Sequence, residues 1–143
     1  MGPRERLTEI TQGGVAMDEL GKFEHIYTED ERHKKTKAEY SRLKKTFNDL
    51  PAEKKRLCEK LLNNAAFSAV LLDEAREIIS RDGMIEAYQN GASQFGLKKS
   101  SAVDIYDKSL NTYSKVIKQL CDMLPEGAAV DPAEEILRFV ASG

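Results

Sequence analysis

The stretch SAVDIYDKSLNTYSKVIKQLCDML, residues 101–124, decides the fold of this chain. Its large apolar side chains recur at alternating intervals of three and four residues, which places them along one side of a helix. They are Val103, Tyr106, Leu110, Tyr113, Ile117, Leu120 and Leu124. Because a stripe of this length is unfavourable in water, the pattern predicts a helix that packs along a partner of similar length.

A matching stripe upstream supplies that partner. It has the same spacing over the same number of turns and consists of Cys58, Leu61, Ala65, Ser68, Leu72, Ala75 and Ile79. Two such helices joined by a loop predict an antiparallel helical hairpin. In that alignment Tyr113 faces Ser68 and Tyr106 faces Ala75. Large side chains then meet small ones, which favours one specific packing.

The composition is typical of a helical protein. The 143 residues suffice for one domain, 32% are charged, tryptophan is absent, and proline and glycine are sparse. No run reaches the roughly 18 apolar residues of a membrane span, and the beginning MGPRERLTEI lacks the apolar core of a signal peptide. We therefore expect a cytoplasmic protein with no membrane partner, in which Cys58 and Cys121 are thiols rather than a disulfide.

The N-terminal part divides into an arm and a basic helix. Residues 1–27 are acidic and contain Gly13-Gly14, so we expect a mobile arm. Thr28 and Glu31 form a capping box, which predicts a helix over 28–47. Tyr40, Leu43 and Phe47 lie along one side of it, and the other sides carry Lys34, Lys35, Lys37, Arg42, Lys44 and Lys45.

This basic helix belongs to a strongly cationic band. Residues 32–56 carry ten basic and three acidic side chains, a local charge of +7 in a chain whose net charge is −2. Such a band can neutralise several phosphates of a nucleic acid and release their counterions. The alternative is a solvated helix face without a ligand, because no base-reading motif accompanies the charges. The six basic residues above are the candidate DNA contacts.

The first hairpin helix, expected over 51–82, is apolar on more than one side. One further stripe of this helix consists of Phe67, Leu71 and Ile78, and another of Leu62, Ala66 and Val70. The expected helix 101–124 has a second stripe of its own, which consists of Ile105, Val116 and Met123. One partner helix cannot cover all of these. Either the basic helix or neighbouring copies of the chain cover them, and we expect both, which makes the protein a homo-oligomer.

Residues 82–101 are expected to form a loop between the two long helices. Asp82-Gly83, Asn90-Gly91 and Gly96 are turn signals, and Ser101 with Asp104 is expected to cap the following helix. The loop also holds two aromatic residues and two lysines: Tyr88, Phe95, Lys98 and Lys99. Aromatic rings beside lysines can hold nucleic acid. We expect the rings to close the open end of the helical hairpin instead, and keep Lys98 and Lys99 as candidate DNA contacts.

Residues 126–143 are expected to be a linker followed by a short helix. Asp131 is a cap, Pro132 suits the first turn and Glu134 follows three residues after the cap. Ile136, Leu137 and Val140 form a small apolar edge. A helix of about nine residues is marginal alone in water. It either folds back on its own subunit or docks on another protein, and both alternatives stay open.

The sequence offers no catalytic or metal-binding set. GxSxG, HExxH and Walker motifs are absent, and His25 and His33 lack partners at metal-ligand spacing. The acid pairs Asp73-Glu74 and Glu134-Glu135 are expected on exposed helix turns. We therefore expect no catalytic residue, metal, cofactor or small-molecule substrate.

The strings LLNNAAFSAVLLDE (61–74) and YQNGASQFGLKKSSAVDIYDKSLNTYSKVIKQLCDMLPE (88–126) resemble the small subunit of bacteriophage terminases. The resemblance covers roughly residues 51–126. It implies an all-α protein that assembles into a ring, binds phage duplex DNA in the host cytoplasm and passes it to the large terminase subunit. That large subunit would supply ATP hydrolysis and DNA cleavage.

One departure from this family matters. Residues 1–47 contain no convincing helix-turn-helix, so sequence-specific base reading is not expected. In this interpretation residues 28–125 form the DNA-binding and oligomerisation domain, and the C-terminal helix is a docking element. The alternative is a helical adaptor that binds only protein.

Overall fold

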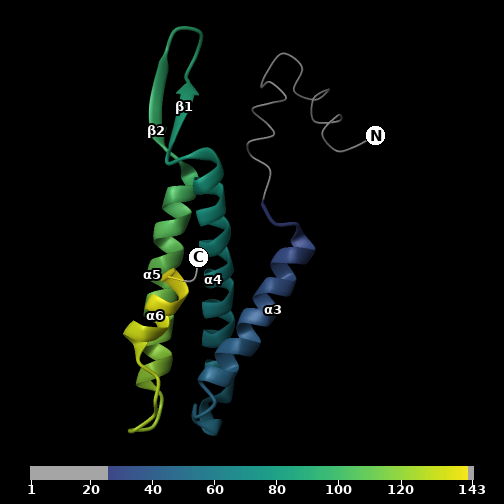
Figure 1. The fold of residues 1–143 in the computed structure, drawn as a ribbon, viewed down its shortest axis with the longest axis vertical. Coiled ribbons are helices and arrows are strands. Elements are labelled where there is room, and N and C mark those ends of the chain that lie inside the picture. The colour runs from purple at the N-terminus through teal and green to yellow at the C-terminus, as the bar shows by residue number, and fades with distance from the viewer. Residues whose placement is uncertain (1–25, 142–143) are drawn as a thin grey trace.

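The computed structural model describes residues 26–141, and their side chains as far as residue 138. Four α-helices, one 3₁₀ turn and a two-stranded sheet make up this part of the chain (Figure 1). They are α3 (Glu29–Thr46), the turn Ala52–Lys54, α4 (Lys55–Asp82), β1 (Ile85–Gln89), β2 (Phe95–Lys99), α5 (Ser101–Asp122) and α6 (Pro132–Ala141). The protein is therefore mostly helical, but the expected all-α class omitted the sheet.

Helix α3 begins and packs as its sequence predicts. The Thr28 hydroxyl accepts a hydrogen bond of 3.1 Å from the backbone N–H of Glu31. Leu43 and Phe47, one turn apart, are both buried against α4 and α5. The expected arm 1–27 lies outside the described residues except for its last two, Ile26 and Tyr27.

Helices α4 and α5 run antiparallel and form the long axis of the molecule (Figure 1). Several residues of the predicted stripes are buried, including Ala65 and Leu72 of α4 and Tyr113 of α5. The first turns of α5 differ from the prediction. Ala102 and Ser109 are buried there, whereas Val103, Tyr106 and Leu110 are only half-buried. Small side chains at these positions allow close approach of two helices, and the bulkier neighbours then lie at the margin.

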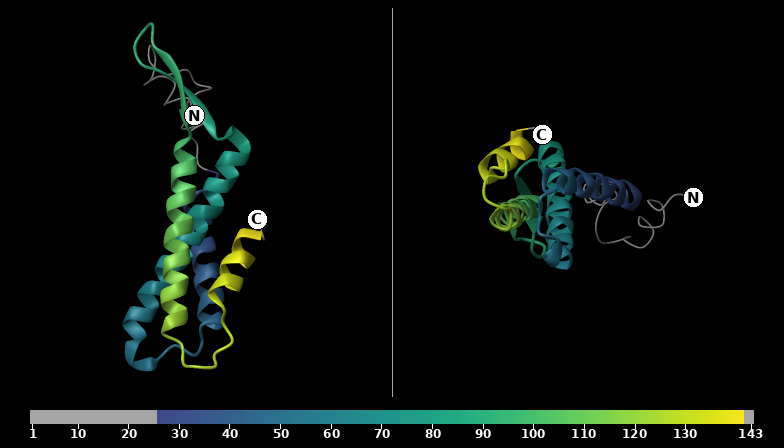
Figure 2. Two further views of the ribbon diagram at one scale, coloured as in Figure 1. Left: turned by 90° about the vertical axis from the view of Figure 1, so that its left-hand side faces the viewer. Right: turned by 90° about the horizontal axis from the view of Figure 1, so that it is seen from below.

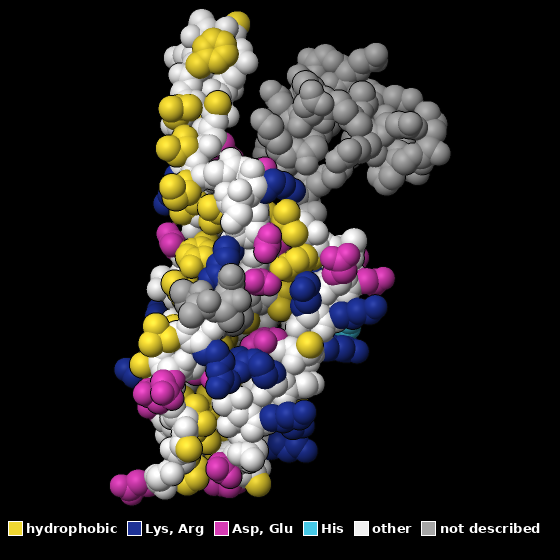
Figure 3. Space-filling model, in the orientation of Figure 1, with side chains coloured by type: hydrophobic (Ala, Val, Ile, Leu, Met, Phe, Trp, Pro, Cys, Tyr) yellow, Lys and Arg dark blue, Asp and Glu magenta, His cyan; other side chains and the backbone are white. Residues whose placement is uncertain are grey.

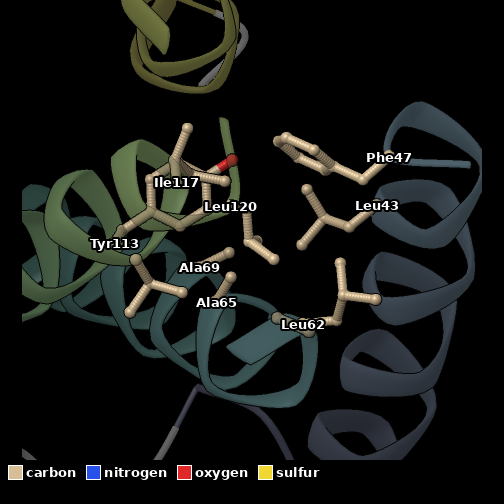
Figure 4. Close-up of a cluster of buried hydrophobic side chains, with 10 residues drawn as sticks. Leu43, Phe47, Leu62, Ala65, Ala69, Tyr113, Ile117 and Leu120 are labelled. Atoms are coloured by element: carbon tan, nitrogen blue, oxygen red, sulfur yellow. The ribbon is translucent and has the colours of Figure 1, made fainter. Parts of the chain in front are cut away.

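The main core lies where α3, α4 and α5 meet. Figure 4 shows Leu43 and Phe47 of α3 directed at side chains of the other two helices. The buried cluster comprises Leu43, Phe47, Leu62, Ala65, Ala66, Ala69, Tyr113, Val116, Ile117 and Leu120. Helix α3 therefore supplies the third wall of a three-helix core, and its position is fixed by apolar packing.

The expected loop 82–101 is wrong, because most of it forms a β-hairpin that projects beyond the ends of α4 and α5 (Figure 1). Strands β1 and β2 are antiparallel, with Ile85 opposite Lys99 and Gln89 opposite Phe95. The turn signals are in place, since Gly83 and Gly91 adopt positive φ angles of 86° and 82°. Phe95 is 74% exposed and does not close the helical hairpin. The cap of α5 is Ser100, whose hydroxyl accepts from the Ala102 N–H, and not Ser101.

Helix α6 folds back on its own subunit. Asp131 caps it as predicted, accepting a 3.0 Å hydrogen bond from the Ala133 N–H. The helix lies beside α5 and near the C-terminal half of α3 (Figure 2), with Ile136 packed against the core. Among the helices of the described residues, none is both long and apolar enough to cross a membrane.

Candidate nucleic-acid interface

Helix α3 presents four exposed lysines on the side opposite its buried residues. With 3.6 residues per turn, Lys34, Lys37, Lys44 and Lys45 fall within an arc of about 100°, and Leu43 lies on the far side of the helix. No ion pair joins any of the four to another residue of the described part of the chain. Figure 3 shows lysine and arginine side chains along the outer edge of α3. We call these four residues the open lysine face.

Further cations lie just past the end of α3. Lys54, Lys55 and Arg56 are exposed at the start of α4, after the turn at Leu50-Pro51. They belong to the cationic band of residues 32–56 but are not among the six candidate contacts on the basic helix. Their positive charge can be read from the sequence, and because the structure leaves them exposed, they are available to an anion.

The first turns of α3 are anchored to α4 by an ionic network. Arg32 Nη2 lies 2.9 Å from Glu74 Oε2 and also donates to the backbone oxygen of Tyr27. Glu74 is only 6% exposed, so its expected position on a solvated turn is wrong. Asp73 accepts a 2.7 Å hydrogen bond from the Tyr27 hydroxyl. Burial first, and then Asp73, raise the pKa of that hydroxyl.

Lys35 lies between the anchored side and the open side of the helix. Its Nζ is 4.7 Å from the centroid of the Tyr27 ring, and the residue remains exposed. A cation over an aromatic face keeps its charge, so Lys35 can still act on a nearby phosphate.

Arg42, one of the six expected contacts, is not an open cation. Its Nη2 lies 2.6 Å from Glu39 Oε1 and 2.7 Å from Glu135 Oε1 of α6. Burial lowers its pKa, but the hydrogen bonds to Glu39 and Glu135 outweigh this and the pKa is raised. Glu135 is 5% exposed, so its expected exposure is also wrong. Of the two carboxylates that cover Arg42, Glu39 is three positions away, a spacing at which helical ion pairs form, and Glu135 is 93 positions away, which sequence spacing does not predict.

The two lysines of the β-hairpin are each paired with an acid. Lys98 Nζ lies 3.2 Å from Glu86 Oε1, and Lys99 Nζ lies 2.7 Å from Asp104 Oδ1. The hydrogen bond from Lys99 holds the pKa of the Asp104 carboxyl below its usual value. Because each pair is neutral as a unit, these lysines add little to a phosphate-binding surface, although both remain exposed.

The residues expected at subunit contacts divide into two groups. Leu62, Ala66, Val70 and Val116 are buried within the single chain, so they are not available to a second copy. Leu62, Ala66 and Val116 share the core cluster with Leu43 and Phe47. The basic helix α3 therefore covers these three residues, which was one of the two alternatives that the sequence left open. Phe67 and Ile105 are exposed, while Leu71, Ile78 and Met123 are half-buried.

The β-hairpin carries an exposed apolar surface that is not among the candidate sites predicted from the sequence. Residues opposite one another in the register share a face of the ribbon. One face thus has Ile85, Ala87, Phe95 and Leu97, with the polar Gln89 and Lys99 at its two ends. We call the four apolar residues the apolar β face. Ile85, Phe95 and Leu97 are 62%, 74% and 73% exposed. On the other face the Tyr88 ring lies so close to Gly96 that a Cβ there would come within 2.6 Å of it.

No protein-family model, curated protein or solved structure matches this chain. Within residues 26–141 no group of three or more histidine, cysteine or acidic residues is arranged to hold a metal ion. The strongest candidate site is therefore the open lysine face of α3.

Proposed function

We propose that this chain is a non-catalytic small terminase subunit, which binds duplex DNA through its phosphates. The single observation that carries the proposal is the open lysine face: four exposed ammonium groups on one rigid helix, without acidic partners among the described residues. The resemblance of residues 51–126 to the phage family adds the context of genome packaging in the host cytoplasm. The large terminase subunit would perform the ATP hydrolysis and DNA cleavage.

The four lysines define how binding should depend on salt. Each neutralised phosphate contributes about −0.9 to the slope of log K against log salt concentration, so four contacts give about −3.6 per subunit. Raising the salt from about 50 to 200 mM then weakens binding roughly 150-fold. The contacts are to phosphates and not to bases, so the affinity should be similar for unrelated duplex sequences.

We propose that the protein acts as a homo-oligomeric ring, and two exposed apolar surfaces support the oligomer. A two-stranded ribbon is at best marginally stable in water, yet the apolar β face is largely exposed in the single chain. Phe67 of α4 and Ile105 of α5 are further exposed apolar side chains. Neighbouring copies would cover these groups and would place several open lysine faces on one DNA molecule.

Helix α6 is the proposed docking element for the large terminase subunit. Ile136 packs on the core of its own subunit and is therefore not available. Leu137 is exposed and can meet a partner. The side chain of Val140, the third residue of the expected edge, lies outside the described residues.

The second candidate function is a helical adaptor that binds only protein. The exposed apolar β face favours it, since such a surface can also receive a different protein. In this alternative the lysines of α3 serve solubility, and DNA is not a ligand.

Binding to duplex DNA by a pair of charge-reversal variants separates the two functions. K44E/K45E changes the open lysine face, and K115E/K118E makes the same charge change at two exposed positions of α5. If α3 binds DNA, the first variant should bind much more weakly and the second should stay close to wild type. Equal DNA binding by wild type and both variants, at low salt, would favour the adaptor.

A further inference from the structure

The contact between α6 and α3 includes an ion pair between a buried carboxylate and a half-buried guanidinium. Glu135 of α6 accepts a 2.7 Å hydrogen bond from Arg42 Nη2, and its carboxylate is buried whereas the Arg42 side chain is half-buried. Glu39 binds the same Nη2 from within α3. Around this pair the contact is apolar, through Ile136 of α6 and Val130 of the preceding linker. Glu135 is thus the one acidic group that α6 places on the basic helix.

Arg42 lies beside the open lysine face. At about 100° per residue it is some 60° around α3 from Lys45, which follows it by three residues. Lys35 lies on the same flank, seven residues or about two turns earlier, and is exposed. The Arg42 side chain is itself 35% exposed. A phosphate bound at Lys45 would therefore lie next to a guanidinium whose access is limited by the Glu135 carboxylate.

Helix α6 is suited to leave this position. It has ten residues, and a helix of this length is marginal by itself, so packing keeps it in place. The packing is incomplete, because an open groove of about 670 Å³ lies between α6 and the last turn of α3, lined by Thr46, Asp131, Glu134 and Arg138 among others. The linker before α6 includes Gly127 with a φ of 90°, a conformation that glycine adopts readily.

We propose that Arg42 is a latent phosphate-binding residue of the α3 surface, and that α6 covers it with Glu135 as an internal competitor for DNA. The inference rests on the proposed role of α3 in DNA binding. A guanidinium forms paired hydrogen bonds with either a carboxylate or a phosphate, so the two ligands can exchange at one site. DNA bound along the open lysine face would draw Arg42 away from Glu135 and loosen α6.

This competition is reciprocal. If DNA weakens the docking of α6, then anything that removes α6 must strengthen DNA binding by the same factor. A partner that holds α6 through Leu137 would therefore increase the affinity of the subunit for DNA. Uncovering Arg42 adds one phosphate contact, which is worth roughly five- to tenfold in affinity at about 0.1 M salt.

The test uses the full chain and a matched pair of variants. E135Q removes the α6 charge from Arg42 and leaves the bond to Glu39, whereas E134Q removes the same charge one residue earlier, where the carboxylate lines the groove and forms no ion pair with Arg42. We expect E135Q to bind duplex DNA five- to tenfold more tightly than E134Q, with a salt slope steeper by about 0.9. The double variant R42Q/E135Q should lose this gain. Equal affinities and slopes for E135Q and E134Q would overturn the proposal.

A second measurement needs no substitution near the ion pair. Cys121 is half-buried, and burial followed by nearby Asp122, Glu135 and Asp131 raises its pKa to about 11. Cys121 packs against the same core cluster as Ile136 of α6, whereas Cys58 is buried and serves as an internal control. Saturating duplex DNA should accelerate alkylation of Cys121 in the wild type and leave Cys58 unchanged. Unchanged or slower labelling of Cys121 would contradict the release of α6.

The two proposals fail in distinguishable ways. If K44E/K45E binds DNA as well as wild type does, the α3 surface is not a DNA site and both proposals fail. If K44E/K45E binds DNA weakly, but E135Q and E134Q have equal DNA affinities and DNA does not change the alkylation rate of Cys121, only the proposal for Arg42 and α6 fails.

Discussion

Replacing Leu43 by alanine tests whether α3 is an integral wall of the core. Leu43 is fully buried between α4 and α5, and its side chain is directed at theirs (Figure 4). Truncation removes buried apolar surface and leaves a cavity, and fully buried Leu→Ala substitutions cost about 3–5 kcal/mol. A domain of this size is stabilised by about 5–15 kcal/mol, so L43A should lose a large fraction of its stability.

The control for this prediction is Leu57→Ala. Leu57 lies on the first turn of α4 and is 50% exposed, so the same chemical change should cost less than about 1 kcal/mol. Urea unfolding followed by circular dichroism gives the free energy of unfolding of wild type and both variants. Equal losses for L43A and L57A, or no loss for L43A, would show that α3 is not packed as described.

Three further predictions concern other parts of the molecule. The variant F95S/L97S, which makes the apolar β face polar, should lower the solution mass of the assembly measured by light scattering, and an unchanged oligomer would refute the role of this face. Glu74→Ala should lower the free energy of unfolding by about 1–3 kcal/mol, because it leaves the Arg32 guanidinium without its buried partner. Glu77 is exposed, so Glu77→Ala should be nearly neutral. Similar losses for the two variants would contradict the anchoring role of Glu74. The alkylation rate of Cys121 in the folded chain should keep rising to about pH 11, since burial raises its pKa, and a plateau near pH 9, as in urea, would contradict the burial of this thiol.

The raised pKa of Cys121 also makes the free energy of unfolding depend on pH. The thiol ionises at a lower pH in the unfolded chain than in the folded one. Its contribution to stability is therefore complete below the unfolded pKa and is lost as the pH rises through about 11.

The features that the sequence predicts best are local ones. The caps at Thr28 and Asp131 depend on residues two or three positions apart, and both are present. The apolar side of α3 was also predictable, because Leu43 and Phe47 are one turn apart and follow a clear polar pattern. In each case the interacting groups belong to the same short segment, so spacing alone determines the outcome.

The failures come from contacts between distant segments. Glu74 and Glu135 look like ordinary surface acids, and their burial depends on Arg32 and Arg42, which are 42 and 93 positions away. Apolar stripes on α4 show that a cover is needed without showing which element provides it. Leu62 was thus assigned to a second copy although α3 belongs to the same core cluster.

The β-hairpin was missed for a different reason. The segments IEAYQ and FGLKK are only five residues each, and their strand-favouring residues are Ile85, Tyr88 and Phe95, so the signal in each segment is short. Glycines and an Asn-Gly pair dominated the pattern and indicated a loop. The turn was correctly located, but the pairing on either side of it is a property of the two strands together.

The salt dependence of duplex DNA binding by the intact chain tests most directly the claim that α3 is a phosphate-binding surface. We expect log K to fall linearly with log salt concentration between about 50 and 200 mM, with a slope of −3.6 or steeper. Binding that does not change over this range, or no binding at the low-salt end, would contradict that claim.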